Sequence, residues 1–199
     1  MLRTKGRQQV ALSRKEHLVQ TALELFYRDG FHSTGIDKIL RESGVAKMTL
    51  YKHFRSKEEL ILAVLEERDR QFREWFLREL ERRAVTPQEK LLAAFDVLEL
   101  WFHGEFRGCM FINAAAEYSD INEDIHRFSG DHKKHMLKYL TDLAQAAGAP
   151  DPESLAFQLN MLIEGAIVIA HVCQDPSSAQ KAKVAAKTLI ESALSAEVD

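Results

Sequence analysis

The segment Ile36–Phe54 constrains the fold more than any other part of this chain, because it contains two short helical patterns with a glycine between them. Apolar residues at helical spacing mark the first helix at Ile36, Ile39 and Leu40, and the second at Val45, Leu50 and Phe54. Glycine just past a helix adopts the left-handed conformation that ends it, so we expect a turn at Gly44. The second helix carries mainly polar, hydrogen-bonding side chains. A helix-turn-helix places such a helix in the major groove of DNA, so this segment predicts DNA binding.

The other periodic segments also have helical spacing, and none alternates like a strand. Ser13–Glu16 and Thr86–Glu89 have the pattern of a capping box, and Pro87 suits the first position of a helix. Further helix starts are predicted at Thr34, Ser56, Asp120, Asp151 and Asp175. We therefore predict an all-α chain of about nine helices. Three form an N-terminal head with the helix-turn-helix, one bridges, and five form a C-terminal helical body.

Charge is divided unevenly along the chain. Residues 1–57 carry 12 Lys and Arg against 5 Asp and Glu, whereas residues 58–199 carry 15 against 25. A basic head on an acidic body suits a protein that presents one end to phosphates. We expect a DNA-binding domain at 1–57 and a regulatory domain at 58–199, with the bridging helix at about 57–84.

Composition argues against a membrane or secreted protein. The N-terminal residues Met1–Arg7 are polar and basic, unlike a secretory signal, and no uninterrupted apolar run reaches the ~20 residues that cross a bilayer. Two cysteines, Cys109 and Cys173, are too few for a disulfide framework. We expect a cytoplasmic location and no membrane partner.

Three motifs resemble the N-terminal domain of the TetR family of transcriptional regulators. They are TGIDKI at 34–39, SGVAKMTLYKHF at 43–54 and SKEELI at 56–61. The resemblance implies a repressor that is released from a palindromic operator by a small-molecule effector, with a C-terminal body for ligand binding and dimerisation. One departure is Ala46, where the family often has a serine that caps the recognition helix; its absence removes a cap worth ~1 kcal/mol.

The expected DNA contacts divide by physical role. Thr34 and Lys57 lie at predicted helix starts, where backbone N–H groups favour an anion, so we expect them to contact phosphates. Tyr51 resembles the family's tyrosine whose hydroxyl contacts the DNA backbone, although it could instead support the head as a partly buried aromatic. The candidates for base edges or flanking phosphates are Lys47, Met48, Thr49, Lys52 and His53. A basic arm of Arg3, Lys5 and Arg7 is expected to add minor-groove or phosphate contacts.

The last two predicted helices resemble the family's dimerisation element. The eighth is apolar over more than one face, so it needs cover from its own body and from a partner. The ninth offers small residues that permit close approach. The interface residues that we expect are Leu159, Ile163, Ala166, Ala186, Leu189, Ile190 and Ala193. The alternative is that both helices belong to a purely intramolecular core.

A polar set among apolar residues predicts an effector pocket in the body. Glu164 lies in the apolar run MLIEGAIVIA, where an unpaired carboxylate is expensive to bury. Unless it satisfies a helix end or Asn113, it would favour a cationic or hydrogen-bond-donating ligand. The predicted pocket residues are Trp101, Phe102, Asn113, Glu117, His135, Tyr139, Met161, Glu164 and His171.

Other chemistry has weaker support. His132 and His135, with His126 or Glu117, have spacings that could hold zinc, but eight histidines make such spacings common, so no metal is predicted. Cys109 at a helix start is either a redox switch or an ordinary buried cysteine. We find no phosphate-binding glycine loop, no paired catalytic carboxylates and no supported nucleophile–base pair, so we predict neither an enzyme nor a cofactor.

Three classes of function therefore remain. The leading one is the effector-responsive regulator, which needs double-stranded operator DNA, a second copy of the chain and a small molecule of unknown identity. The runner-up is an effector-independent DNA-binding dimer whose body serves only dimerisation. An enzyme built on a helical scaffold is the third.

Overall fold

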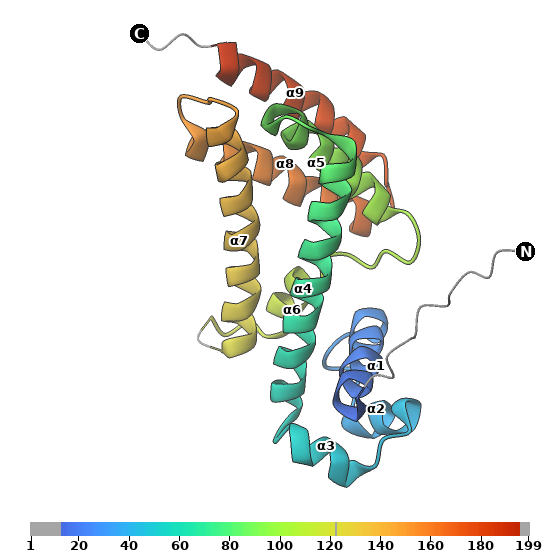
Figure 1. Ribbon diagram of the computed structural model, residues 1–199. Coiled ribbons are helices and arrows are strands. Elements are labelled where there is room, and N and C mark those ends of the chain that lie inside the picture. The colour runs from blue at the N-terminus through green and yellow to red at the C-terminus, as the bar shows by residue number, and fades with distance from the viewer. Residues whose placement is uncertain (1–12, 122, 196–199) are drawn as a thin grey trace, which may run out of the picture. The chain divides into compact units, whose positions relative to one another are not determined.

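A computed structural model describes residues 13–121 and 123–195 of the chain. The described residues form nine α-helices and contain no strand, which confirms the predicted all-α class (Figure 1). The helices are α1 Arg14–Asp29, α2 Ile36–Ser43, α3 Lys47–His53, α4 Lys57–Arg83, α5 Pro87–Phe102, α6 Met110–Glu117, α7 Asp124–Ala146, α8 Pro152–Val172 and α9 Ser178–Ser195. The chain divides into two compact units, 1–64 and 65–199, so the division falls inside α4.

Several helix starts follow the predicted capping chemistry. The hydroxyl of Ser13 accepts from the backbone N–H of Glu16, and the Glu16 carboxylate accepts from the backbone N–H of Ser13 in return. Thr86 and Glu89 form the same reciprocal pair at the start of α5. Each pair satisfies two backbone donors that a helix start leaves free, which fixes where the helix begins.

Three predicted helix starts are wrong. Gly35, not Thr34, occupies the capping position of α2, and it offers no side-chain bond. Helix α7 begins at Asp124 after Glu123, because the carbonyl of Asp120 instead closes a turn with the N–H of Glu123 at 3.0 Å. Helix α9 begins at Ser178, because the Asp175 carboxylate accepts from the N–H of Ser177 at 3.0 Å. Short polar side chains stabilise turns as readily as helix starts, so the same residue types mark both.

The first unit packs α1, α2, α3 and the start of α4 around one apolar core. Phe26 stacks on Phe31 with ring centroids 5.2 Å apart. Leu50 and Phe54, which the helical spacing marked as apolar positions of the second helix, are buried and anchor the recognition helix to this core. Gly44 ends α2 with a φ of 65°, the left-handed conformation that tolerates glycine best. The turn between the two helices is therefore built from the residues that the sequence singled out.

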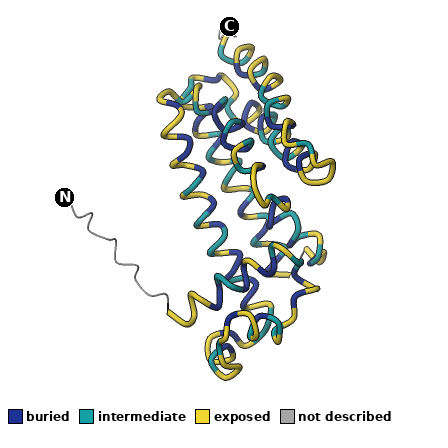
Figure 2. The backbone as a smooth tube through the Cα atoms, turned by 90° about the vertical axis from the view of Figure 1, so that its right-hand side faces the viewer, coloured by how far each residue is buried: buried dark blue, intermediate teal, exposed yellow. Residues whose placement is uncertain are grey.

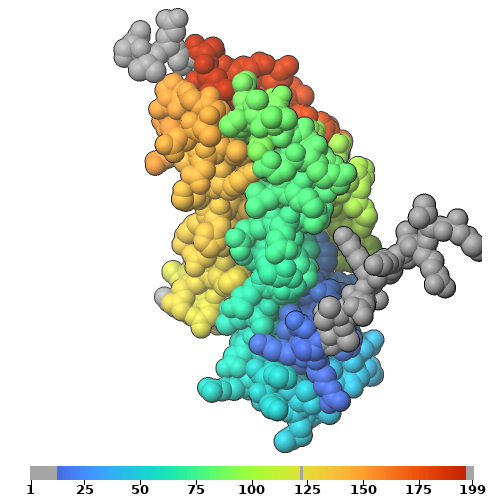
Figure 3. All heavy atoms as spheres, viewed as in Figure 1, coloured from blue at the N-terminus to red at the C-terminus, as the bar shows by residue number. Residues whose placement is uncertain are grey.

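The second unit is organised around α5. This helix packs on α7, α8 and α9, and α8 in turn lies between α7 and α9. Figure 3 shows the part of α4 after residue 64 beside α7 on the face turned to the viewer, and Asp69 and His132 link these two helices. Figure 2 shows buried and exposed positions alternating along the helices, as amphipathic packing requires. Phe72, Phe76 and Leu80 of α4 pack with Ala94 and Val97 of α5 in a buried apolar cluster.

Candidate nucleic-acid interface and body cavity

Helix α3 presents nearly all of its side chains to solvent. Of its seven residues only Leu50 is buried, whereas Met48 is 83% exposed and Tyr51 46% exposed. Lys47, Lys52 and His53 are also exposed, and Thr49 is partly exposed. Ala46 precedes the helix without a side-chain cap, as its sequence implies. The helix is held by one apolar anchor and leaves the rest of its surface available for contact.

The segment from α3 to the first residue of α4 is basic, and the nearest acidic residues in the sequence, Glu58 and Glu59, follow in the first turn of α4. Residues 47–57 contain Lys47, Lys52, Arg55 and Lys57 and no Asp or Glu. Among the described residues, none of these four cations has an ion-pair partner, although ion pairs are frequent elsewhere in the chain. Lys57 lies in the first turn of α4, where backbone N–H groups point outward and favour an anion. Unpaired cations beside a helix start suit phosphate binding.

Two of the expected DNA contacts need comment. Thr34 is fully buried, and its hydroxyl donates to the carbonyl of Leu25 at 3.4 Å, so it braces α1 rather than lining the surface. The arm residues Arg3, Lys5 and Arg7 lie outside the described residues. The remaining candidates, Lys47 to His53 and Lys57, lie on α3 and at the start of α4.

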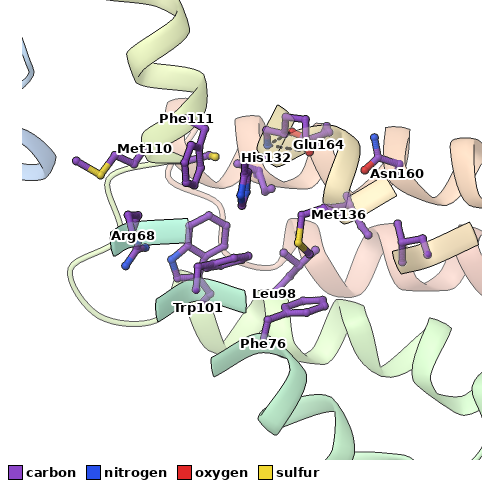
Figure 4. A pocket seen from close by; sticks show the side chains of 16 residues that line it. Arg68, Phe76, Leu98, Trp101, Met110, Phe111, His132, Met136, Asn160 and Glu164 are labelled. Atoms are coloured by element: carbon purple, nitrogen blue, oxygen red, sulfur yellow. Dashed lines mark hydrogen bonds and ion pairs between the residues drawn. The ribbon is translucent and has the colours of Figure 1, made fainter. Parts of the chain in front are cut away.

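The second unit contains a cavity that is lined by five helices. Phe72 and Phe76 of α4, Trp101 of α5, Phe111 of α6 and His132 of α7 supply aromatic walls (Figure 4). Its free volume is about 30 Å³, which is room for about two water molecules. Glu164, Lys133 and Asn160 bring polar atoms to one side. The cavity is thus mostly apolar with a few placed polar groups, as ligand sites usually are.

A buried histidine joins two walls of this cavity. Nδ1 of His132 lies 2.7 Å from the carboxylate of Asp69 on α4, and Arg73 donates to that carboxylate at 2.6 Å. Burial lowers the pKa of His132 to about 4, although the bond to Asp69 works against this shift. Burial also opposes the charge of Asp69, but the bonds from Arg73 and His132 outweigh it and hold its pKa below the usual value. Neutral His132 therefore donates from Nδ1, and Nε2 keeps its lone pair.

Glu164 has an internal partner. Lys133 Nζ donates to both carboxylate oxygens of Glu164, at 2.8 and 2.7 Å. The two side chains are 26% and 29% exposed. Although burial opposes its charge, the neighbouring Cys109 and Glu164 side chains raise the pKa of Lys133 above the usual value. Lys133 thus already neutralises the carboxylate for which we expected a cationic or hydrogen-bond-donating ligand.

Of the predicted pocket residues only Trp101 and Glu164 line the cavity. The reason is that α7 and α8 turn different faces toward the cavity from those that the sequence predicted. Helix α7 lines the cavity with His132, Lys133 and Met136, whereas His135 is exposed and Tyr139 packs on the apolar cluster of α4 and α5. Helix α8 lines it with Asn160, Ile163 and Glu164, whereas Met161 and His171 are exposed. On α5 and α6 the cavity excludes Phe102, Asn113 and Glu117, and Asn113 donates to the carbonyl of Arg107.

The orientation of α8 also changes which residues are available for a dimer interface. Leu159, Ala166, Ala186 and Ile190 are buried within the chain, and Ile163 lines the cavity, so these five are not free for a partner. Leu189 and Ala193 are partly exposed. Instead the outer face of α8 exposes a row of apolar residues at spacings of three and four: Phe157, Met161, Gly165, Val168 and Val172. Val184 of α9 is 71% exposed.

The arrangement of the described histidines and cysteines gives little support to a metal site or a redox switch. Within residues 13–121 and 123–195, no three His, Cys, Asp or Glu side chains converge as metal ligands. His126 is engaged with the carbonyl of Tyr118, and His132 with Asp69. Cys109 is buried and lines the cavity, whereas Cys173 is exposed.

Comparison with known proteins matches both units to models of one family. Residues 18–64 match bacterial regulatory proteins of the tetR family, and residues 87–186 match the tetracyclin repressor-like C-terminal domain. A solved TetR-family transcriptional regulator from Streptomyces coelicolor has a TM-score of 0.83 and 31% identity, with 91% of this chain and 96% of that chain covered.

Curated relatives agree. The HTH-type transcriptional repressor NemR of Escherichia coli K12 is 29% identical over 113 residues, and the match covers 56% of this chain and 57% of NemR. An uncharacterised HTH-type transcriptional regulator of Lactococcus lactis is 27% identical over 174 residues, covering 81% of this chain and 85% of the relative.

The buried histidine predicts a pH-dependent stability. Because the folded-state pKa of His132 is about 4, below the ~6.5 of an unfolded histidine, the unfolded state binds more protons between these values. The contribution of His132 to the free energy of unfolding is therefore fully present above about pH 6.5 and is lost as the pH falls toward 4. We expect His132 to account for about 2 kcal/mol of the loss between pH 7 and pH 5.

Urea unfolding at both pH values, at one protein concentration, measures this. His132→Asn keeps a donor for Asp69 but does not titrate, so it should lose about 2 kcal/mol less than wild type over this interval. His103→Asn changes an exposed histidine at the end of α5 and serves as the control. Equal losses in His132→Asn and wild type would contradict the assignment.

Proposed function

The chain belongs to the TetR family of transcriptional regulators, and from this premise we propose that it is a repressor released from a palindromic operator by a small-molecule effector. The observation that carries DNA binding is the exposed face of α3 and the start of α4. There Lys47, Lys52, Arg55 and Lys57 have no ion-pair partners among the described residues. Phosphates would supply the missing counter-charges, while the other exposed side chains of α3 would contact base edges.

A second copy of the chain is proposed to cover the outer face of α8. This helix is 21 residues long with a mean hydropathy of 1.6, which by length and composition would also allow a membrane span. Polar residues on α9 and the charged pair of Glu164 suit a protein interface and a cytoplasmic location better. Burying Met161, Val168 and Val172 against the same surface of a partner is isologous, as two-fold symmetry requires. Such a dimer matches the symmetry of a palindromic operator.

Effector response is proposed for the body cavity. Helix α4 contributes Lys57 to the proposed DNA face and Phe72 and Phe76 to the cavity wall, so one continuous helix belongs to both sites. A ligand shifts a conformational equilibrium only through different affinity for the two states. One that fits only an expanded cavity would have such a difference, because the cavity now has about 30 Å³ of free volume.

That small volume also favours the second candidate, an effector-independent dimer whose body only dimerises. The two candidates separate in one experiment. Protein is bound to genomic fragments flanking its own gene, and small-molecule extracts are then added. Release of the specific DNA supports the repressor with an effector, whereas specific binding that no extract changes supports the second candidate.

The DNA face is tested by substitution. Lys57→Ala removes a phosphate contact, and we expect weaker operator binding by about tenfold together with a shallower dependence on salt, because fewer counterions are released. Tyr51→Ala should also weaken binding without changing the helical content. Lys134→Ala, an exposed lysine of α7, is the matched control. If Lys57→Ala and Tyr51→Ala both bind the operator as wild type does in a fluorescence-anisotropy titration, the proposed DNA face is wrong.

The dimer surface is tested by charge. Val172→Glu places a carboxylate in the proposed interface, where it would lose its water without gaining a partner, so we expect monomers at micromolar concentration. Val85→Glu substitutes another exposed valine, which lies between α4 and α5 and outside α8, and this variant should stay dimeric. Sedimentation velocity distinguishes the species. A monomeric wild type, or a dimeric Val172→Glu variant, would rule out the surface.

A further inference from the structure

The walls of the body cavity are built from flat rings. Phe72 lies 4.9 Å from Trp101 between ring centroids, and Phe111 stacks on His132 at 3.6 Å with an interplanar angle of 14°. In Figure 4 Phe76, Trp101 and Phe111 surround the space from different helices. Aromatic faces and edges attract another ring beyond its simple burial. The walls therefore favour an aromatic ligand.

The size of that ligand is limited, but the walls can yield. Met110 and Met136 both line the cavity. Methionine has three rotatable side-chain bonds and no branch, so it can repack around a guest at low cost. The free volume of about 30 Å³ is too small for a ring as it stands. A ligand of one or two rings therefore requires both methionines to repack, and an extended ligand would require a larger change.

The charges at the cavity are already paired inside the chain. Lys133 binds both oxygens of Glu164, and Asp69 behind His132 is held by Arg73. Arg68 lies 5.9 Å from the ring of Phe72 and is likewise engaged within the chain. An anionic ligand that took Lys133 would leave Glu164 beside it without a counter-charge. A cation that took Glu164 would strand Lys133 in the same way, so either charge is penalised.

Hydrogen-bonding capacity does remain. Within the described part of the chain the side-chain amide of Asn160 has no hydrogen-bond partner, and it lines the cavity. An amide offers one acceptor and two donors, so it can meet a ligand hydroxyl or amide in either sense. The cavity can thus reward a polar group that carries no charge.

We propose that the cavity selects a small, uncharged aromatic molecule of one or two rings that carries one hydrogen-bonding polar group. This inference rests on the proposed effector function and specifies the chemical class of the effector. Of the two ligand classes expected from the sequence, cationic or hydrogen-bond-donating, it keeps only the second, because Lys133 supplies the positive charge that Glu164 needs.

Three probes of equal shape test the selection: naphthalene-2-carboxamide, naphthalene-2-carboxylate and 2-naphthylmethylammonium. Calorimetry and quenching of tryptophan fluorescence, to which Trp101 in the cavity wall contributes, report their dissociation constants. We expect the neutral amide to bind at least about tenfold more tightly than either ion, since each ion must break a partly buried pair. Ile163→Trp, or Ile167→Phe if the first variant does not fold, fills the cavity and should abolish binding.

Variants of the ion pair make the test sharper. Glu164→Gln leaves Lys133 without its counter-charge, so the carboxylate probe should gain at least about tenfold relative to the amide. Lys133→Met should give the same gain to the ammonium probe. Asp142→Asn breaks the exposed pair with Lys138 on α7 and should leave the wild-type order unchanged.

The outcomes separate the inference from the function on which it rests. Equal binding of all three probes, or a preference of wild type for an ion, overturns the chemical class while the cavity-filling variant still shows where the probes bind. An unchanged order in Glu164→Gln and Lys133→Met overturns it too. If no probe binds but an extract still releases the operator DNA, the chemical class is wrong and the effector function stands. If no probe binds and no extract releases the DNA, both are wrong.

Discussion

Charge inside an apolar body has to be paired, and in this chain the pairing fixes how the body helices face one another. Two consecutive residues of α7 make the connections. His132 reaches Asp69 on α4, and Lys133 reaches Glu164 on α8. Because the two side chains point to different neighbours, rotation of α7 would leave Glu164 without its counter-charge and would remove the bond from His132 to Asp69, which Arg73 would then hold alone. Removing one partner leaves the other group without its bond in a partly buried place, which costs more free energy than the pair contributes. The orientation of α7 is therefore well specified.

This constraint explains the cavity and its character. With α7 fixed, Met136 faces inward, and α8 turns Ile163 and Glu164 to the same space. The outer face of α8 is then left apolar at Met161 and Val172 and without cover from the chain. Pairing inside the body therefore accounts for both a neutral cavity and the surface that we propose for a second copy.

Local signals made the head predictable from the sequence. Gly44, the Ser13 capping box and the buried anchor Leu50 each depend on a few neighbouring residues, and all three are present as predicted. The same reasoning was wrong at Thr34, because a hydroxyl near a helix start can also bond inward, as it does to Leu25. Local sequence patterns therefore predicted the helices of the head, but they gave the wrong hydrogen-bond partner for Thr34.

The body was less predictable, because its decisive partners are distant in sequence. Lys133 and Glu164 are 31 residues apart, and Asp69 and His132 are 63 apart, so no local pattern relates them. Helix α8 is apolar on more than one face. The spacing of its apolar residues does not show which face packs inside the chain and which face contacts a partner. For this reason the sequence predicted Met161 in the same pocket as Glu164, although Met161 is exposed on the outer face.

In the function that we propose, occupation of the cavity and binding of DNA oppose each other. Thermodynamic linkage makes this measurable from the ligand side, because a ligand that weakens DNA binding by some factor must itself bind the DNA complex more weakly by the same factor. The neutral naphthalene amide is titrated by calorimetry into free protein and into the operator complex. The account predicts weaker binding to the complex, by the factor found when the amide is present in a DNA titration. Equal affinity for the two forms would contradict it.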